Sequence, residues 1–466
     1  MIAATASTIA SWCNAKLVGH DCDIRGVGID SRSIGQGSLF VALPGERVDG
    51  HRFVGSAFAN GAGAALVDES RLEELLNELK SSDVALLASN DVLSALANLA
   101  HAWRQQTFVS MVAVTGSNGK TTVKEMLSAV FRRVGTTHAT SGNFNNHIGV
   151  PLTLLAMEPT DRYAVVEMGA NHPGEIAALT EIAQPQVGVI TQCAPAHLAG
   201  FKTVDGVARA KAEIYEGLPA AGTAVINADD AYASLWRKIA GHCKQLTFGL
   251  SNAADVYASD LKASAEGTRF DLCFEQSQTP VQLNLAGEHN VRNALAVAAA
   301  AIACHVELDA IAAGLSDVQP VGGRMQPRRG LGGATIIDDT YNANPVSLQA
   351  GLAVLATRGG ERWLVLGDMA ELGDEEREFH REAGRLARAH GVTRLYGCGQ
   401  LTSETVSSFG QDGRHFRCRG ALSESVRADL DAQSDAEGVT ILVKGSRSAG
   451  MEAVVRAITV SNGGSR

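Results

Sequence analysis

Short, continuously apolar segments alternate with segments of helical periodicity along the middle of the chain. The apolar segments are 109–114, 163–168, 187–191 and 223–227. Segment 204–217, between the last two of them, has the spacing of a helix. Continuous apolar runs are typical of strands that are buried on both faces. The alternation therefore predicts a mostly parallel sheet with helices covering both sides.

The pattern changes between residues 245 and 285, where apolar and polar positions alternate. Segments 267–274 and 281–285 have the period of two that is typical of strands with one buried face. We expect them to form antiparallel strands added to the parallel sheet. A helix over 289–304 then completes this part of the chain.

Three domains are expected from these patterns. The first part ends in a helical segment at 92–103, and a Gly/Pro-rich joint at 319–330 precedes a third part with strands at 335–338, 362–366, 392–396 and 440–444. The predicted domains are 1–105, 106–319 and 320–466. The fold class is α/β, with a smaller N-terminal α/β domain, a central P-loop parallel-sheet domain with added antiparallel strands, and a C-terminal Rossmann-like domain.

Composition and charge agree with a folded multidomain protein and exclude several other classes of protein. The 466 residues exceed one ordinary domain of ~100–200 residues. With 40 Lys and Arg against 50 Asp and Glu, the net charge of −10 offers no broad basic face, so no nucleic-acid partner is expected. Eight cysteines without a C-x-x-C pair suggest neither zinc nor disulfides. The apolar stretch at 294–304 is too short to span a membrane and residues 1–14 lack a signal peptide, so we expect a cytoplasmic protein.

A phosphate-binding loop is predicted where the strand at 109–114 meets the following helix. Its residues are Gly116, Ser117, Asn118, Gly119, Lys120, Thr121 and Thr122. Backbone N–H groups and a helix N-terminus converge on phosphate in such loops, while the lysine reaches the β- and γ-phosphates and the hydroxyl binds Mg²⁺. Val114 replaces the first glycine of the usual motif, and Gly116 forms the turn instead. The loop indicates a nucleoside triphosphate but does not choose among GTPase, kinase, motor and ligase.

Six further segments resemble the Mur ligase family, the cytoplasmic ATP-dependent amide ligases of peptidoglycan synthesis. They are 141–153, 165–176, 194–198, 338–345, 366–373 and 442–447, in that order along nearly the whole chain. The last three look like those of the member that joins D-alanyl-D-alanine to UDP-N-acetylmuramoyl-tripeptide. The resemblance implies ATP and Mg²⁺ as cofactors, these two compounds as partners, an acyl phosphate intermediate and a monomeric enzyme.

The resemblance also implies the metal-binding and catalytic residues. Thr121 and Glu167 would bind Mg²⁺, while His197 and a carbamylated Lys211 would bind a second Mg²⁺; Lys120, His197 and Lys211 would be catalytic. From chemistry alone, Glu167 at a strand end could equally cap a helix, His197 could be a structural residue and Lys211 a solvated helix lysine. Unmodified lysine would repel Mg²⁺.

The nucleotide contacts implied by the resemblance come from two domains. They are His289, Asn290 and Asn293 near adenine, Arg324 at the phosphates, and Asp339 at the ribose with Tyr341 beside it. An N-cap by Asn290 is an equal alternative from the residues alone. Because Lys120 and Asp339 belong to different domains, we expect ATP to bind between them and closure of the third domain to complete the site.

Candidate substrate contacts are polar residues in three loops. They are Ser31 and Arg47 for the UDP end, Asn143, Asn145 and Asn146 for substrate, and Asn342 and Asn344 for the dipeptide. Surface-loop positions for the first two, and ordinary turn positions for the asparagines after residue 140, are the structural alternatives.

Two other functions are weighed against this one. The sister ligase that adds diaminopimelate or lysine as the third residue carries an Asp-Asn-Pro-Arg motif, which this sequence lacks; the comparable region is 341–345. A P-loop regulatory ATPase would need only the loop, Glu167 and a mobile segment. That alternative gives the first domain and segment 338–345 no role.

Overall fold

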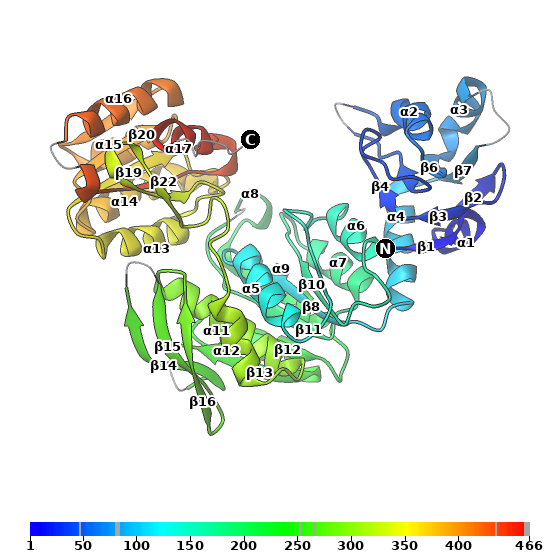
Figure 1. Cartoon of the computed structure of the whole chain (residues 1–466), viewed down its shortest axis with the longest axis horizontal. Helices are drawn as coiled ribbons and strands as arrows, with labels where there is room; N and C mark the ends of the chain where they lie inside the picture. Colours follow the sequence, from blue (N-terminus) through cyan, green and yellow to red (C-terminus); the bar gives the residue numbers. More distant parts are fainter. Residues whose placement is uncertain are drawn as a thin grey trace.

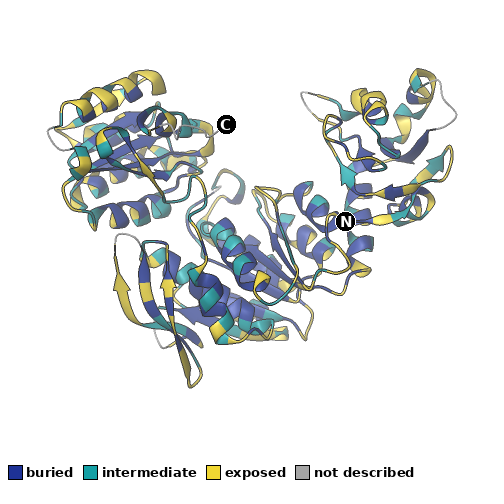
Figure 2. Ribbon diagram, in the orientation of Figure 1, coloured by how far each residue is buried: buried dark blue, intermediate teal, exposed yellow. Residues whose placement is uncertain are grey.

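The computed structural model describes residues 1–45, 48–79, 84–196, 198–250, 253–264, 267–433 and 436–460. The N-terminal and C-terminal lobes stand apart above the central lobe, which joins them (Figure 1). The central strands of each sheet and the inward helix faces are buried, and the exposed residues lie on the outer helix faces, on loops and on strands such as β14 and β16 (Figure 2). No helix within the described ranges is long and apolar enough to cross a bilayer.

The N-terminal lobe contains a five-stranded sheet in the order β2-β7-β6-β5-β4 and a two-stranded sheet of β1 and β3. The strands are β1 (Ala3–Thr5), β2 (Lys16–Val18), β3 (Asp23–Arg25), β4 (Val27–Gly28), β5 (Leu39–Val41), β6 (Ala64–Asp68) and β7 (Ala85–Ser89). The helices are α1 (Ala6–Trp12), α2 (Val54–Ala59), α3 (Leu72–Leu79) and α4 (Val92–Gln105). The apolar face of α4 packs on α6 and α7 of the central lobe, which attaches the two lobes.

The central lobe has a nine-stranded sheet in the order β16-β15-β14-β13-β12-β11-β8-β10-β9. The strands are β8 (Ser110–Thr115), β9 (Thr137–Ala139), β10 (Tyr163–Glu167), β11 (Val187–Ile190), β12 (Thr223–Asn227), β13 (Lys244–Gly249), β14 (Val256–Ala263), β15 (Thr268–Phe274) and β16 (Ser277–Leu283). The helices are α5 (Lys120–Arg132), α6 (Gly149–Leu155), α7 (Glu175–Ala183), α8 (Leu198–Phe201), α9 (Val204–Glu216), α10 (Ala233–Ile239), α11 (Glu288–Ala303) and α12 (Leu308–Ser316).

This sheet confirms the predicted parallel core with added antiparallel strands. β15 pairs antiparallel with both β14 and β16, as expected. However, β13 pairs parallel with β12, and β14 pairs parallel with β13. The alternation of apolar and polar residues after position 245 reflects exposure of one face of the sheet, which does not determine strand direction.

The C-terminal lobe has a six-stranded sheet in the order β17-β18-β22-β19-β20-β21, parallel except for β17. The strands are β17 (Gln326–Arg329), β18 (Thr335–Asp339), β19 (Glu361–Gly367), β20 (Arg394–Cys398), β21 (Gly413–Phe416) and β22 (Val439–Lys444). The helices are α13 (Pro345–Ala356), α14 (Glu376–Ala389), α15 (Thr402–Phe409), α16 (Arg419–Asp431) and α17 (Glu452–Ile458). Helices cover both faces, as the Rossmann-like prediction requires.

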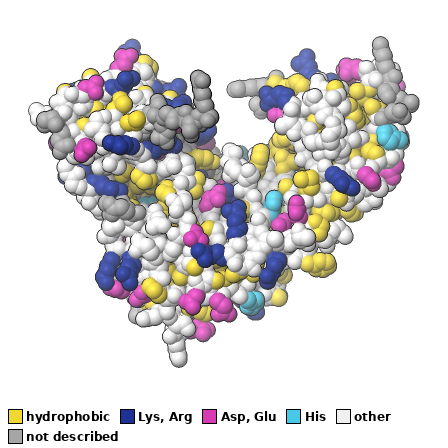
Figure 3. All heavy atoms as spheres, in the orientation of Figure 1, with side chains coloured by type: hydrophobic (Ala, Val, Ile, Leu, Met, Phe, Trp, Pro, Cys, Tyr) yellow, Lys and Arg dark blue, Asp and Glu magenta, His cyan; other side chains and the backbone are white. Residues whose placement is uncertain are grey.

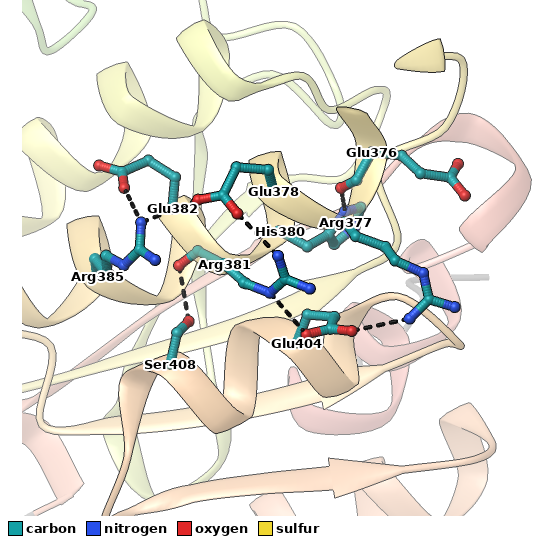
Figure 4. A network of polar contacts seen from close by, with 9 residues as sticks. All are labelled: Glu376, Arg377, Glu378, His380, Arg381, Glu382, Arg385, Glu404 and Ser408. Atoms are coloured by element: carbon teal, nitrogen blue, oxygen red, sulfur yellow. Dashed lines mark hydrogen bonds and ion pairs between the residues drawn. The ribbon is translucent and has the colours of Figure 1, made fainter. Parts of the chain in front are cut away.

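A network of ion pairs holds α14 against α15 on the outer surface of this lobe (Figure 4). Arg377 and Arg381 both donate to the carboxylate of Glu404, at 2.9 and 3.0 Å. Beneath them the buried ring of His380 donates from Nδ1 to the carbonyl of Glu376 and accepts the N–H of Met369 at Nε2. Exposed pairs of this kind contribute little individually, so the network mainly fixes the relative position of the two helices.

Candidate active site

The loop after β8 has the geometry of an anion-binding site. Gly119 adopts a φ of +83° and caps the N-terminus of α5, so that the first N–H groups of the helix are directed out of the loop. Gly116 has a φ of +150°, and a Cβ at this position would lie 1.8 Å from the hydroxyl of Thr191. That hydroxyl in turn donates to the carbonyl of Asn118 at 2.5 Å. The close approach of Thr191 therefore requires glycine at position 116.

Lys120 lies inside this loop. Its Nζ donates to the carbonyl of Gly116 at 2.7 Å. Burial lowers the pKa of the Lys120 ammonium, the charge of Glu167 raises it, and the charge of Arg324 lowers it. A phosphate bound in the loop would replace the lost hydration of this ammonium.

Glu167 ends β10 and is only 2% exposed. Its two carboxylate oxygens each accept one neutral donor: the hydroxyl of Thr121 at 2.8 Å and the side-chain amide of Asn145 at 2.7 Å. A hydroxyl and a carboxylate held side by side are hard oxygen ligands, which fit Mg²⁺ together with nucleotide phosphates. Among the described residues no group of three or more His, Cys, Asp or Glu side chains could hold a metal.

Lys211 lies on α9 and is 2% exposed. Burial, with a smaller contribution from the charge of Lys120, lowers the pKa of its amine to about 7. Within the described part of the chain its Nζ makes no hydrogen bond. The structure therefore contradicts a solvated helix lysine, and the lowered pKa leaves a substantial fraction of the amine neutral near pH 7, which is the form that reacts with CO₂. His197, expected beside it, lies outside the described residues.

The C-terminal lobe contributes a second carboxylate. Asp339, at the end of β18, pairs with the buried ammonium of Lys444 at the end of β22, 2.5 Å away. Its other oxygen accepts the backbone N–H of Met325 at 3.2 Å. Burial lowers the pKa of the nearby His289 to about 4, so its imidazole is neutral near pH 7. This side of the site is charge-compensated and rich in hydrogen-bonding groups.

Arg324 connects the two sides. Its guanidinium lies over the ring of Tyr341, 4.0 Å from the centroid, and donates to the hydroxyl of Thr121 at 2.8 Å. A second bridge joins Asn344 to Asn118, with the amide of Asn344 donating at 2.7 Å. Asn344 also caps α13. The first turn of α13 is therefore tied directly to the phosphate loop.

A cavity of about 900 Å³ lies between the central and C-terminal lobes. Figure 3 shows the surface hollowed above the central lobe, between the outer lobes. The predicted residues lining the cavity are Ser117, Asn118, Gly119, Lys120, Thr121, Thr122, Asn145, Asn146, Glu167, His289, Asn290, Asn293, Arg324, Asp339, Tyr341, Asn342 and Asn344. The fold thus brings together residues predicted from two domains.

Other predicted residues lie elsewhere. Gly116, Asn143 and Lys211 are not among the described residues that line the cavity; Gly116 and Lys211 are buried. Ser31 is buried in the N-terminal lobe, where its carbonyl accepts the side chain of Asn60. Arg47 lies outside the described residues.

Two asparagines have structural contacts that bear on their predicted roles. Asn146 lines the cavity, but its side chain also accepts the N–H groups of Ile148 and Gly149 at the start of α6. Asn290 is not an N-cap, because α11 begins two residues earlier and Gly287 occupies the cap position. Its amide instead donates to the carbonyl of Ala286. Asn293 donates to Asn290 at 3.3 Å.

The sequence prediction omitted Lys444 and Thr191 from the site. Lys444 ends an otherwise apolar strand at its carboxyl edge, which is the same signal that singled out Glu167. Thr191 directly follows a buried strand as well. A charged or polar residue that directly follows a buried strand was therefore the signal that could have found both.

Three family models match the chain. The Mur ligase family, catalytic domain model matches residues 23–104, the Mur ligase middle domain model matches residues 114–301, and the Mur ligase, glutamate ligase domain model matches residues 323–447. The phosphate loop, Glu167 and Lys211 fall in the second match, and Asp339 and Lys444 fall in the third.

Individual proteins are similar over almost the full length. The UDP-N-acetylmuramoyl-tripeptide–D-alanyl-D-alanine ligase of Escherichia coli K12 is 42% identical over 98% of this chain and 99% of the relative. A crystal structure of MurF from Acinetobacter baumannii has a TM-score of 0.91 at 33% identity and covers 98% of both chains. The structure of the MurF ligase of Thermotoga maritima in complex with ADP has a TM-score of 0.78 at 26% identity and covers 93% of this chain and 96% of that chain.

Proposed function

The chain belongs to the Mur ligase family of ATP-dependent ligases, and from this premise we propose that it joins D-alanyl-D-alanine to UDP-N-acetylmuramoyl-tripeptide. The observation that carries the proposal is 42% identity over 98% of the chain to a ligase of that activity. A cavity with a phosphate loop on one wall supports it. The products are ADP, phosphate and the UDP-linked pentapeptide, and the reaction takes place in the cytoplasm.

The chemistry explains why several cations must meet in one cavity. A carboxylate is a poor electrophile, so its oxygen first attacks the γ-phosphorus of ATP, and the bond to the β-phosphate oxygen breaks to release ADP. The amine of the dipeptide then attacks the carbonyl carbon of the acyl phosphate, the C–O bond breaks to release phosphate, and the nitrogen loses a proton. The phosphates and the carboxylate repel one another until fixed positive charges offset that repulsion.

Residues of the chain supply this positive charge and orient the phosphates. The loop N–H groups and Lys120 hold the β- and γ-phosphates, and Arg324 approaches from the opposite lobe. Thr121 and Glu167 would hold Mg²⁺, and a carbamylated Lys211 with His197 would hold a second ion. When bound, Mg²⁺ polarises the phosphoryl oxygens and neutralises their charge.

The remaining contacts divide the substrates among three domains. Domain 106–319 holds the phosphates, and its residues His289, Asn290 and Asn293 lie at the adenine. Domain 320–466 holds the ribose through Asp339 with Tyr341 beside it, and the dipeptide through Asn342 and Asn344. Domain 1–105 holds the UDP end through Ser31 and Arg47. Asn143, Asn145 and Asn146 face the acceptor substrate, and closure of the third domain completes the site.

Phosphate release with different amines tests this function. ATP is combined with the UDP-tripeptide, with the UDP-dipeptide or with neither, and each mixture receives D-alanyl-D-alanine, diaminopimelate, lysine or no amine. Turnover is expected only for the UDP-tripeptide with D-alanyl-D-alanine, and Lys120→Ala should abolish it. Turnover of the UDP-dipeptide with diaminopimelate or lysine would instead assign the chain to the sister activity, and hydrolysis without substrates would indicate a regulatory ATPase.

A further inference from the structure

Lys124 is a buried lysine that the reaction described above does not use. It lies one turn after Lys120 on α5 and is 2% exposed. Its Nζ donates to the carbonyl of Thr140 at 2.8 Å and pairs with the carboxylate of Glu125 at 2.6 Å. Burying an ammonium is unfavourable unless it is paired and hydrogen-bonded. An apolar side chain would fill the same space at lower cost, so the charge needs a reason.

The carbonyl that Lys124 binds belongs to a residue that is itself bonded to β10. Thr140 is buried, its N–H donates to the carbonyl of Val165 at 3.0 Å, and its hydroxyl accepts the N–H of Glu167 at 3.0 Å. Thr140 therefore connects α5 with the backbone of Glu167, the residue expected to bind Mg²⁺.

Thr140 also begins the segment that carries Asn145. The amide of Asn145 holds one carboxylate oxygen of Glu167 at 2.7 Å, and its carbonyl accepts the N–H of Gly169 at 2.8 Å. The other carboxylate oxygen accepts the hydroxyl of Thr121, which lies on α5 three residues before Lys124. Lys124 thus closes a ring of contacts that runs through α5, Thr140 and both ends of Glu167.

We propose that Lys124 is a positioning residue. By holding Thr140, it keeps the side chains of Glu167 and Asn145 beside that of Thr121, in the arrangement that binds a divalent cation. The inference rests on the proposed function in one respect: that a divalent cation binds beside Glu167. It assigns no contact between Lys124 and substrate. The hydrogen bond from Lys124 on α5 to Thr140 thus helps to fix both the backbone and the carboxylate of Glu167. Hydrogen bonds that orient the ligands of a metal in this way strongly affect metal affinity.

Direct metal binding tests this role without turnover. Free Mn²⁺ is titrated by electron paramagnetic resonance against the full chain in the presence of ADP, with no UDP substrate or amine. Lys124→Met should weaken Mn²⁺ binding by ~10-fold while leaving the ADP affinity without metal unchanged. Because neither peptide substrate is present, failure of the dipeptide assignment would not alter this result.

Ser128→Ala is the matched control. Ser128 is fully buried on the same helix, one turn after Lys124, and donates only to the carbonyl of Lys124. The Ser128→Ala variant should have a lower melting temperature than the parent but the same Mn²⁺ affinity. Thr140→Val should weaken Mn²⁺ binding in the same direction as Lys124→Met, and Thr140→Ser, which keeps the hydroxyl, should restore it.

Mn²⁺ affinity within twofold of the parent in folded Lys124→Met would overturn the proposal. If that variant does not fold, Lys124→Gln decides the question, because it removes the charge and shortens the reach to Thr140. A several-fold loss of Mn²⁺ affinity in Lys124→Gln supports the role, and parental affinity rejects it.

Discussion

Glu167 and Asp339 occupy equivalent places in two different sheets but are surrounded by different partners. Each ends a parallel strand at its carboxyl edge, and both line the same cavity. Glu167 accepts only neutral donors, from Thr121 and Asn145. Asp339 is paired with the buried ammonium of Lys444. Among the described residues, Glu167 therefore accepts hydrogen bonds from neutral groups, with the charge of Lys120 acting on it from nearby, whereas Asp339 is directly paired with an ammonium.

The difference indicates how one chemical group, the carboxylate, can serve two purposes. A carboxylate with neutral hydrogen-bond donors keeps its charge available for a cation, because those donors orient the charge and do not neutralise it. A carboxylate paired with ammonium carries little net charge and remains a good acceptor for neutral hydroxyls, such as those of ribose. Substituting the two carboxylates, or the residues around them, should therefore have effects that differ in kind and in size.

The largest effect is expected for Glu167→Gln. The amide oxygen can still accept one of the existing hydrogen bonds, so the fold should persist, but the charge for the cation is lost. We expect kcat to fall by ~10³-fold and Mn²⁺ binding to the ADP complex to be lost, as measured by phosphate release and paramagnetic resonance. Glu216→Gln, on the exposed end of α9, is the control. Retained Mn²⁺ binding in Glu167→Gln would show that Glu167 is not the cation-binding carboxylate.

Lys211→Met asks whether a second anion accompanies Glu167. With a pKa of about 7, the Lys211 amine becomes neutral as pH rises through that value, and only the neutral amine forms a carbamate. In bicarbonate-depleted buffer, added bicarbonate should therefore stimulate the parent more one unit above this pKa than one unit below it. Lys211→Met should lose this response and ~10²-fold of kcat.

The control for this experiment is Lys238→Met, an exposed lysine on α10. It should keep the bicarbonate response of the parent. Near-parental kcat in Lys211→Met would remove Lys211 from the metal site and leave Glu167 as the one proposed anion there.

Asp339→Asn should weaken nucleotide binding without abolishing turnover. Replacing this charged acceptor should weaken ADP binding by ~10-fold, measured by calorimetry, and the uncompensated ammonium of Lys444 should lower the melting temperature. Adding Lys444→Met should recover stability but not ADP affinity. Asp338→Asn is the matched control, since Asp338 pairs with Arg328 away from the cavity. Unchanged ADP affinity in Asp339→Asn would contradict the ribose assignment.

Tyr341→Leu should have the smallest effect. It removes the ring beneath Arg324 and keeps an apolar side chain, so the KM for ATP should rise by about threefold, the size of one partly exposed cation–π contact. Tyr341→Phe should match the parent in a steady-state ATP titration. A loss in Tyr341→Phe equal to that of Tyr341→Leu would assign the effect to the phenol hydroxyl.

Contacts confined to a short stretch of sequence were predictable. The phosphate loop is specified within eight consecutive residues, because a strand, two glycines and a helix start determine where its N–H groups point. The position of Glu167 at the end of an apolar strand was also readable locally, but its metal-binding role was predicted only through the family resemblance. Strand direction at β13 did not follow from local pattern, because direction is decided by pairing with β12.

Contacts between distant segments were not predictable from pattern. Lys444 and Asp339 are 105 residues apart, and Asn118 and Asn344 are 226 apart. Each side chain alone resembles an ordinary polar residue at the end of a strand or the start of a helix. The burial that lowers the pKa of Lys211 likewise depends on how α9 packs against β8 and β11.

The sequence by itself determined the α/β class, the order of the elements, the phosphate loop and, through its motifs, the family. Hydrophobic periodicity and backbone preferences act over a few residues, so they can be read locally. Only the tertiary structure decided which carboxylate is paired with an ammonium, which lysine has a pKa lowered by burial, and which buried lysine contacts the segment around Glu167. These properties depend on desolvation and on partners brought within hydrogen-bonding distance from remote parts of the chain.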